Sequence, residues 1–289
     1  MADVLVTTDP LTEYRQARVR ALIGAAEAED GVRPASDRAL VNIGSGAVTH
    51  LIASATGGEL AGYAQLDPDG SAELAVRPAH RNRGHGRELL DELLTQRPTA
   101  RVWAHGDLPA ARALAASARL TRARALWQMT RPLEAPLPVP ELPEGVTIRT
   151  FDPGPDDGPW LAVNADAFAD HPEQGSVTLE DLRSLMAQPW FDPGGFFVAE
   201  RNGRMAGFHW TKIAEPGRGE VYVLGVRPDE QGTGLGRALT LIGLHHLRDT
   251  GVHEAMLYVE ESSTPARSLY SSLGFVRTGI DVQYAATSP

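Results

Sequence analysis

The chain has 289 residues, of which 42% are hydrophobic and 22% are charged, and it contains no cysteine. This length suits two domains of ordinary size, and the composition is typical of a globular protein that buries a core. Without cysteine there is no disulfide framework, no thiolate zinc site and no cysteine nucleophile. The formal net charge of −10 argues against a nucleic-acid partner, because such binding requires clustered Lys and Arg.

The amino-terminal segment carries neither a basic stretch nor an apolar one, so the sequence predicts no signal peptide. No uninterrupted apolar run approaches the roughly 20 residues that cross a bilayer. We therefore expect a cytoplasmic protein without a membrane partner, and the absence of cysteine favours the same compartment.

The first half of the chain predicts an α/β pattern. In chain order, the periodicities predict a helix over 14–28, strands over 60–66 and 72–76, a helix over 87–94 and a short strand over 100–104. The second strand leads into Arg77-Pro78 and then into Arg81-Asn82-Arg83-Gly84-His85-Gly86. This half therefore contains a strand, a glycine turn and a helix in succession.

A proline-rich segment over 131–145 divides the chain nearly in half. Prolines lack amide donors and favour extended geometry, so this segment predicts a stiff linker. We expect an N-terminal lobe over 1–131, a linker over 132–145 and a C-terminal lobe over 146–289. Two lobes that close on each other would make a monomer.

The second half repeats the pattern of the first. The predictions are a helix over 160–168, strands over 195–200, 205–212 and 221–226, a helix over 237–244 and a strand over 255–259. Arg227-Pro228 and Gln231-Gly232-Thr233-Gly234-Leu235-Gly236 lie 150 residues after their counterparts in the first half. Further on, residues 266–275 match residues 111–120. Two such matches indicate a duplicated module.

The two glycine turns are candidate anion sites. Glycines let backbone amides close around a phosphate, and the start of the next helix adds the positive end of its dipole. The dinucleotide fingerprint Gly-x-Gly-x-x-Gly is incomplete, because Leu89 and Leu239 stand at its third glycine. A tight glycine turn without a ligand is the alternative interpretation for each lobe.

The form Arg/Gln-x-x-Gly-x-Gly after a strand resembles the pyrophosphate loop of the GCN5-related N-acetyltransferase superfamily. The resemblance covers both halves. It implies an α/β class with a tandem GCN5-related N-acetyltransferase fold, in which each lobe has a central mixed, splayed β-sheet flanked by helices. It also implies acetyl-CoA as co-substrate, and the sequence shows no metal-site spacing.

The cofactor residues follow from the same resemblance. In the C-terminal lobe they are Leu224, Gly225, Val226, Gln231, Gly232, Thr233, Gly234, Leu235, Gly236, Arg237, Ser263, Arg267 and Ser268. In the N-terminal lobe they are Leu74, Ala75, Val76, Arg81, Asn82, Arg83, Gly84, His85 and Gly86. Ser263 replaces the superfamily's Asn in the motif that ends at Gly274-Phe275.

Acetyl transfer to an amine requires a base for the ammonium and an acid for the leaving thiolate. We expect Glu220 to be the base and Tyr270, the superfamily's usual acid position, to be the acid. The offset of 150 residues places Gly70 at the position of Glu220, and the match of 266–275 with 111–120 places Ala115 at that of Tyr270, so the N-terminal lobe is expected to be silent. Strand alternation would turn the nearby Glu73 to the opposite face.

A tandem superfamily member with one silent lobe is the more specific resemblance. It implies a small polar amine acceptor, a cysteinyl-glucosaminyl-inositol whose cysteine amine is acetylated. The acceptor would contact Asp37, Glu173, Lys212, Glu220 and Tyr258. Asp37 alternatively caps a helix. An aminoglycoside-like amine or a peptide N-terminus is a second possible acceptor, and a non-catalytic acyl-CoA sensor is a third hypothesis.

Overall fold

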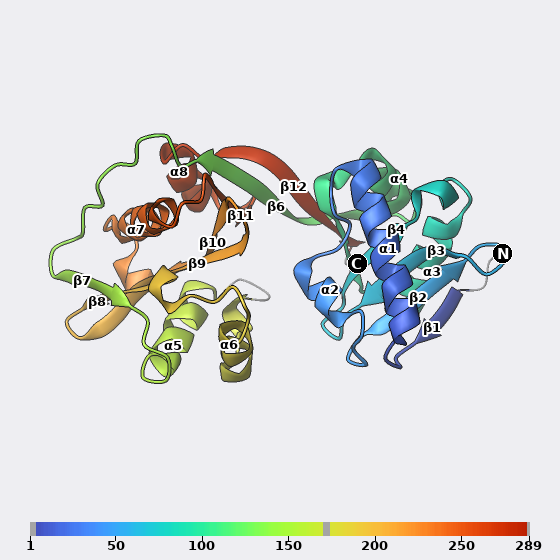
Figure 1. Ribbon diagram of the computed structural model, residues 1–289, viewed down its shortest axis with the longest axis horizontal. Helices are drawn as coiled ribbons and strands as arrows, with labels where there is room; N and C mark the ends of the chain where they lie inside the picture. Colours follow the sequence, from blue (N-terminus) through green and yellow to red (C-terminus); the bar gives the residue numbers. More distant parts are fainter. Residues whose placement is uncertain (1–3, 170–173, 288–289) are drawn as a thin grey trace. The chain divides into compact units, whose positions relative to one another are not determined.

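The computed structural model describes residues 4–169 and 174–287, and contacts divide the chain into two compact units. Unit 1 comprises residues 1–127, 260–262 and 279–289, and unit 2 comprises residues 128–259 and 263–278. Each unit is an α/β layer structure with a central sheet (Figure 1). None of the described helices combines the length and the apolar character that a membrane span requires.

Unit 1 contains the first set of elements. They are β1 (Val4–Thr7), α1 (Glu13–Asp30), α2 (Asp37–Asn42), β2 (Thr49–Ser54), β3 (Leu60–Leu66), β4 (Ser71–Val76), α3 (His85–Gln96), β5 (Arg101–Ala104), α4 (Pro109–Ser117) and most of β6 (Leu120–Pro132). Single 3-10 turns, η1 (Pro78–His80) and η2 (His105–Asp107), follow β4 and β5. The predicted strand over 60–66 and helix over 14–28 are thus confirmed.

Unit 2 repeats this order. Its elements are β7 (Val146–Thr150), α5 (Asp157–Ala167), α6 (Leu179–Met186), β8 (Phe196–Arg201), β9 (Arg204–Glu215), β10 (Arg218–Val226), α7 (Leu235–Asp249), β11 (Glu254–Glu260), α8 (Thr264–Ser272) and the start of β12 (Val276–Ala286). The 3-10 turns η3 (Gln174–Ser176), η4 (Pro193–Gly195) and η5 (Pro228–Glu230) complete it.

Both sheets are mixed, as predicted. In the strand order β1-β2-β3-β4-β5-β12-β6-β11-β10-β9-β8-β7, strands β1 to β5 belong to unit 1 and β7 to β10 to unit 2, whereas β6 and β12 each contribute residues to both units. Neighbours from β1 to β4 and from β7 to β10 are antiparallel, whereas β4 pairs with β5, and β10 with β11, in parallel. The loops that follow the parallel strands therefore meet at one edge of the sheet in each unit, and α/β sheets commonly bind ligands at this edge.

The last strand differs from the sequence-based boundaries. The sequence places residues 279–289 in the C-terminal lobe, but contacts assign them to unit 1, where β12 pairs antiparallel with β5. Val282 is fully buried there, and Asp281 accepts a hydrogen bond from the amide of Gly106. Pairing across 175 residues of sequence depends on tertiary structure, which local periodicity does not contain.

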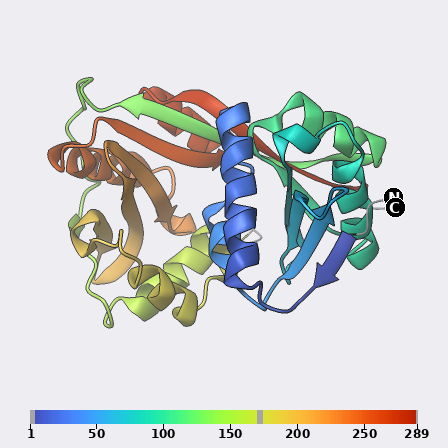
Figure 2. The ribbon, with the colours of Figure 1, turned by 45° about the vertical axis from the view of Figure 1, so that its right-hand side comes forward.

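Each sheet is covered on both faces by helices (Figures 1 and 2). In unit 1, α1 packs on β3 and β4 and buries Val19 and Leu22, while α3 covers the other face with Leu89 and Leu93. In unit 2, α5 and α7 take the corresponding places. The linker is also packed, since Leu133 is buried and its amide bonds to the carbonyl of His253.

Candidate active site

The glycine turn has the same backbone in both units. Gly84 and Gly234 each precede a helix with a left-handed φ, of 94° and 93° respectively. Two residues earlier, Asn82 and Gly232 also have positive φ values of 58° and 77°. These turns aim the amides of the first helical turn, which have no intrahelical partner, toward the space beyond the strand. The predicted anion cradle thus has the required backbone in each unit.

The first residue of each turn braces the loop. The side chains of Arg81 and Gln231 each donate to the carbonyl of the preceding strand end, Val76 or Val226, at 3.3 Å. Arg81 also forms a bidentate pair with Asp30, at 2.7 and 2.6 Å. These hydrogen bonds raise the pKa of Arg81, although partial burial opposes them. Its charge is therefore shared with a carboxylate before any phosphate arrives.

A second contact is repeated in both units. Arg87 on α3 donates to Ser117 at the end of α4, and Arg237 on α7 donates to Ser272 at the end of α8. The duplication seen in the sequence thus extends to side-chain contacts. It also means that Arg237, a predicted cofactor residue, holds α7 against α8 in this structure.

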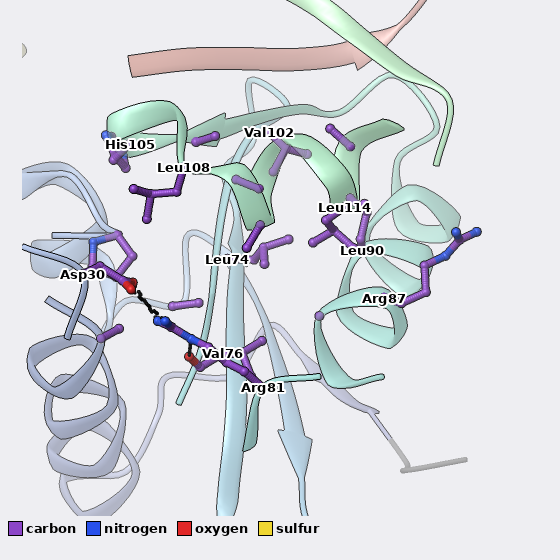
Figure 3. Close-up of a pocket in the computed structure, with 18 of the residues that line it drawn as sticks. Asp30, Leu74, Val76, Arg81, Arg87, Leu90, Val102, His105, Leu108 and Leu114 are labelled. Carbon is purple, nitrogen blue, oxygen red and sulfur yellow. Dashed lines mark hydrogen bonds and ion pairs between the residues drawn. The ribbon is translucent and has the colours of Figure 1, made fainter. Parts of the chain in front are cut away.

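Unit 1 contains a pocket of about 720 Å³, a volume in the range of small-molecule sites. Its lining includes most of the cofactor residues predicted for this lobe, namely Leu74, Ala75, Val76, Arg81, Asn82, Gly84 and Gly86. Arg83 is exposed and His85 is buried, and neither lines the pocket. Figure 3 shows the Asp30–Arg81 pair on one side of this pocket and Leu90 and Leu114 on the other.

The candidate base in unit 2 lies in an aromatic and charged environment. Glu220 Oε2 is 3.6 Å from Lys212 Nζ, and the two side chains are 18% and 11% exposed. The ammonium of Lys212 lies 5.1 Å from the ring centre of Trp190 and 5.2 Å from that of Tyr222. Such rings attract a cation, so they hold the lysine beside the carboxylate. The roles of Trp190 and Tyr222 could not be predicted from the sequence, because the contact with Lys212 joins separate segments.

A β-bulge distinguishes unit 2 from unit 1. Strand β10 shifts register against β9 between Val221 and Val223, which leaves Tyr222 as an extra residue. Strand β4 pairs with β3 without any shift. A bulge inserts one residue and reverses the alternation of side chains beyond it.

Because of this bulge, two predictions made from the sequence are wrong. Counted along the ladders, Glu220 corresponds to Ser71 and not to Gly70, and the parallel pairs Glu220↔Met256 and Ser71↔Arg101 agree. Glu73 was expected to point to the opposite face, but it corresponds to Val223, which packs in the same cluster as Trp210 and Tyr222. Glu73 therefore lies on the face equivalent to that of Glu220. The prediction assumed that side chains alternate between faces along the whole strand, and the extra residue at the bulge reverses that alternation.

The same irregularity changes where the parallel strands separate. The ladder between β10 and β11 ends at Glu220↔Met256, whereas that between β4 and β5 continues to Glu73↔Trp103. Compared with β4 and β5 at the corresponding positions of the repeat, β10 and β11 thus diverge two residues earlier. The opening begins directly at Glu220 and exposes the edge of β10 that carries Leu224 and Val226.

Tyr270, the candidate acid, lies on α8 and is buried. Its ring contacts Phe275 at 5.8 Å between centroids. Burial raises the pKa of Tyr270 to about 12, so the phenol keeps its proton at neutral pH. Tyr258 lies on β11 and is 46% exposed. Ser263 is the residue before α8, at the same sheet edge as the glycine turn, and its side chain does not cap the helix.

Of the remaining acceptor residues, Asp37 belongs to unit 1. Asp37 is the first residue of α2 in unit 1, where Ser36 is the cap and Arg33 pairs with Asp37 at 2.6 Å. The alternative interpretation of Asp37 as the cap itself is therefore wrong. Glu173 lies outside the described residues. No group of three or more acidic or histidine side chains suited to a metal occurs within 4–169 and 174–287.

Unit 1 contains a buried charged cluster that the sequence did not predict. His105 lies 3.3 Å from Glu73 through Nε2 and 3.3 Å from Asp281 through Nδ1. Burial alone would lower the pKa of His105, but the hydrogen bonds to both carboxylates raise it to about 9. The other oxygen of Glu73 accepts from the amide of Ser36. Each side chain of the cluster therefore has a polar partner, which indicates that the cluster stabilises the fold of unit 1.

Comparison with known families agrees with this architecture. The model described as the acetyltransferase (GNAT) family matches residues 21–119 and 160–275, once in each half. The chain therefore belongs to the acetyltransferase (GNAT) family. The tandem fold and the N-acetyltransferase class predicted from the sequence are confirmed, and the family implies acetyl-CoA as the acetyl donor.

Individual relatives match over nearly the whole chain. The mycothiol acetyltransferase of Thermomonospora curvata is 56% identical over 292 residues, which cover 99% of this chain and 98% of that protein. That of Streptomyces coelicolor is 51% identical, covering 96% and 94%. A solved GCN5-related N-acetyltransferase from Sphaerobacter thermophilus is 26% identical with a TM-score of 0.73, covering 97% and 94%. A tandem GNAT protein of the clavulanic acid pathway has the same fold, with 20% identity and a TM-score of 0.73, covering 99% of this chain and 100% of that one.

Proposed function

We propose that the protein transfers the acetyl group of acetyl-CoA to the cysteine amine of a cysteinyl-glucosaminyl-inositol, the step that completes mycothiol. Relatives named mycothiol acetyltransferase, at 56% and 51% identity over nearly full length, support this acceptor. The observation in this chain that carries the proposal is the position of Glu220 beside Lys212, where β10 and β11 begin to diverge.

In this proposal unit 2 performs the chemistry. The turn from Gln231 to Gly236 binds the pyrophosphate, and amides near Leu224 and Val226 polarise the thioester carbonyl. Glu220 accepts the proton of the acceptor ammonium, directly or through a water. Tyr270 donates a proton to the leaving thiolate, and its raised pKa of about 12 keeps that proton available.

Unit 1 has Ser71 and Ala115 at the corresponding positions, so we propose that it binds acyl-CoA in its pocket without transferring the acyl group. The acceptor would contact Asp37, Glu173, Lys212 and Tyr258 in addition to Glu220. We propose two functional lobes joined by residues 132–145, in a cytoplasmic monomer: the first spans 1–131 and the second begins at 146, with residues from 279 onward belonging to the first.

Mass spectrometry of the products tests the function. The enzyme is incubated with acetyl-CoA and the cysteinyl amino-sugar acceptor, and the expected product is heavier by one acetyl group on the cysteine nitrogen. Parallel reactions contain an aminoglycoside or a peptide with a free N-terminus. Faster acetylation of either amine would replace the proposed acceptor. Absence of thiol release with every amine, despite tight acetyl-CoA binding, would favour a sensor.

A further inference from the structure

Resting on the proposed function of unit 1, we propose that its pocket selects acyl-CoA thioesters whose acyl chain is apolar and longer than acetyl. The acyl chain would occupy an apolar chamber at the inner end of the pocket. The chamber is lined by Leu74, Leu90, Val102, Ala115 and Leu120.

The chamber penetrates the hydrophobic core of unit 1. Leu90, Val102, Ala115 and Leu120 belong to the core cluster that includes the α3 leucines, and all four are less than 8% exposed. Leu74 packs against the same cluster. Figure 3 shows Leu74, Leu90 and Val102 directed into the pocket from β4, α3 and β5. Core side chains therefore form the wall of a cavity that opens to a ligand.

The corresponding space in unit 2 is filled by aromatic rings. Ala115 and Leu120 match Tyr270 and Phe275 in the repeated segments. Those two rings pack on each other at 5.8 Å, and both are buried. Unit 1 has a methyl group and an isobutyl group in their place. Loss of two rings from a repeated core leaves a volume that a ligand can fill.

The chamber lies where the acyl end of a thioester would be. Tyr270 is the proposed proton donor to the sulfur in unit 2, so the position of Ala115 lies beside the sulfur of a thioester bound in unit 1. None of the five chamber residues is polar; the polar side chains of the pocket lining include Asp30, His80, Arg81, Asn82, Arg87, His105 and Tyr284. A chain that turns from the sulfur toward Ala115 therefore meets only hydrocarbon.

The lining decides the chemical class of the acyl group. The five chamber side chains are hydrocarbon and offer no hydrogen bond, so a hydroxylated or carboxylated acyl group would lose its hydration without compensation. An unbranched aliphatic chain loses nothing and gains burial of each methylene. Hexanoyl-CoA should consequently bind unit 1 at least roughly tenfold more tightly than acetyl-CoA, because each of its four additional methylenes is removed from water.

Isothermal titration calorimetry can measure this preference in the full chain. Gly234→Val in the unit 2 turn serves as the background, because a β-branched residue cannot adopt the φ of 93° found there. Hexanoyl-CoA, acetyl-CoA and succinyl-CoA are titrated into this variant and into the same variant with Ala115→Tyr or Leu120→Phe. We expect the background variant to prefer hexanoyl-CoA, and each filling substitution to remove that preference.

Equal affinity for hexanoyl-CoA and acetyl-CoA in the background variant would overturn the proposal, as would tightest binding of succinyl-CoA. Persistence of the hexanoyl preference in both filled variants would do the same. Circular dichroism verifies that each variant is folded. If one of the two filling substitutions prevents folding, the other still tests the proposal. Product analysis with wild-type enzyme tests the proposed function separately, so the two failures are distinguishable.

Discussion

Glu220 occupies a position that no other described carboxylate of β10 or β11 shares. Lys212 approaches it from β9, and the rings of Trp190 and Tyr222 hold the lysine in place. The carboxylate thus lies 3.6 Å from the ammonium, where it can accept a proton from an incoming amine. A base of this kind contributes about 10²-fold to 10⁴-fold to the rate.

Glu220→Gln should lower kcat by about 10²-fold or more, because the amide has similar size but does not accept the proton. The dissociation constant of acetyl-CoA should change little. Steady-state kinetics and calorimetry measure the two quantities. Glu254→Gln is a matched control, since Glu254 is a strand carboxylate on β11 that pairs with Arg218 at 2.9 Å. Equal rates in the wild type and Glu220→Gln would remove Glu220 from the mechanism.

Tyr270→Phe should slow the release of thiol by about 10²-fold while leaving the thermal midpoint nearly unchanged. The substitution keeps the ring that packs on Phe275 and removes only the hydroxyl. The raised pKa of Tyr270, about 12, predicts further that the wild-type rate does not fall with alkaline pH through ionisation of this phenol below that value. Thiol assays between pH 7 and 10 measure both effects. Wild-type turnover by the phenylalanine variant would assign the acid elsewhere.

At the scale of elements, the bulge at Tyr222 distinguishes β10 from β4, its counterpart in the repeat. It gives β10 one residue more than β4 over the same ladder, and β10 separates from β11 two positions sooner. In the glycine turns that follow the two strands, Gly84 and Gly234 have nearly the same φ, 94° and 93°. The duplicated units thus share the proposed phosphate-binding turn and differ where the chemistry is proposed.

Two helical glycines should respond in opposite directions to alanine. A Cβ at Gly243 on α7 would overlap the ring of His209, which is fully buried and bonded to the carbonyl of Leu239. Gly243→Ala should therefore destabilise the protein by about 1–3 kcal/mol. Gly24 on α1 is exposed with open space around it, so Gly24→Ala should stabilise by about 0.5–1 kcal/mol. Denaturant unfolding of both variants measures the contrast, and a stabilising Gly243→Ala would contradict the packing.

At the scale of the whole molecule, unit 1 depends on β12, which lies far along the sequence from its other strands. Strand β12 pairs with β5, and Asp281 joins the cluster of His105 and Glu73. Tyr284 lines the pocket and donates to Asp107. Unit 1 therefore cannot complete its sheet or its pocket until the C-terminal residues have been synthesised.

The cluster around His105 predicts a loss of stability in alkaline solution. The pKa of His105 in the folded protein, about 9, lies above its unfolded value of 6.5. The stabilising contribution of the protonated imidazole is therefore complete below pH 6.5 and disappears as the pH rises through 9. The expected decrease in the free energy of unfolding is at most about 3 kcal/mol. Urea unfolding at pH 6.5, 7.5 and 9.5 measures it. His105→Gln should show a flatter profile over this window, and a flat wild-type profile would mean that the imidazolium does not stabilise unit 1.

The sequence by itself determined the duplication, the strand–turn–helix order, the glycine turns and the residues at the sheet edge. These features depend on local periodicity and on glycine spacing, which a linear chain displays directly. Only the tertiary structure decided the face of Glu73, the partner of β12, the aromatic surroundings of Lys212 and the chamber beside Ala115. Each of these depends on a register shift or on contacts between distant segments, and one bulged residue is enough to reverse what strand alternation predicts.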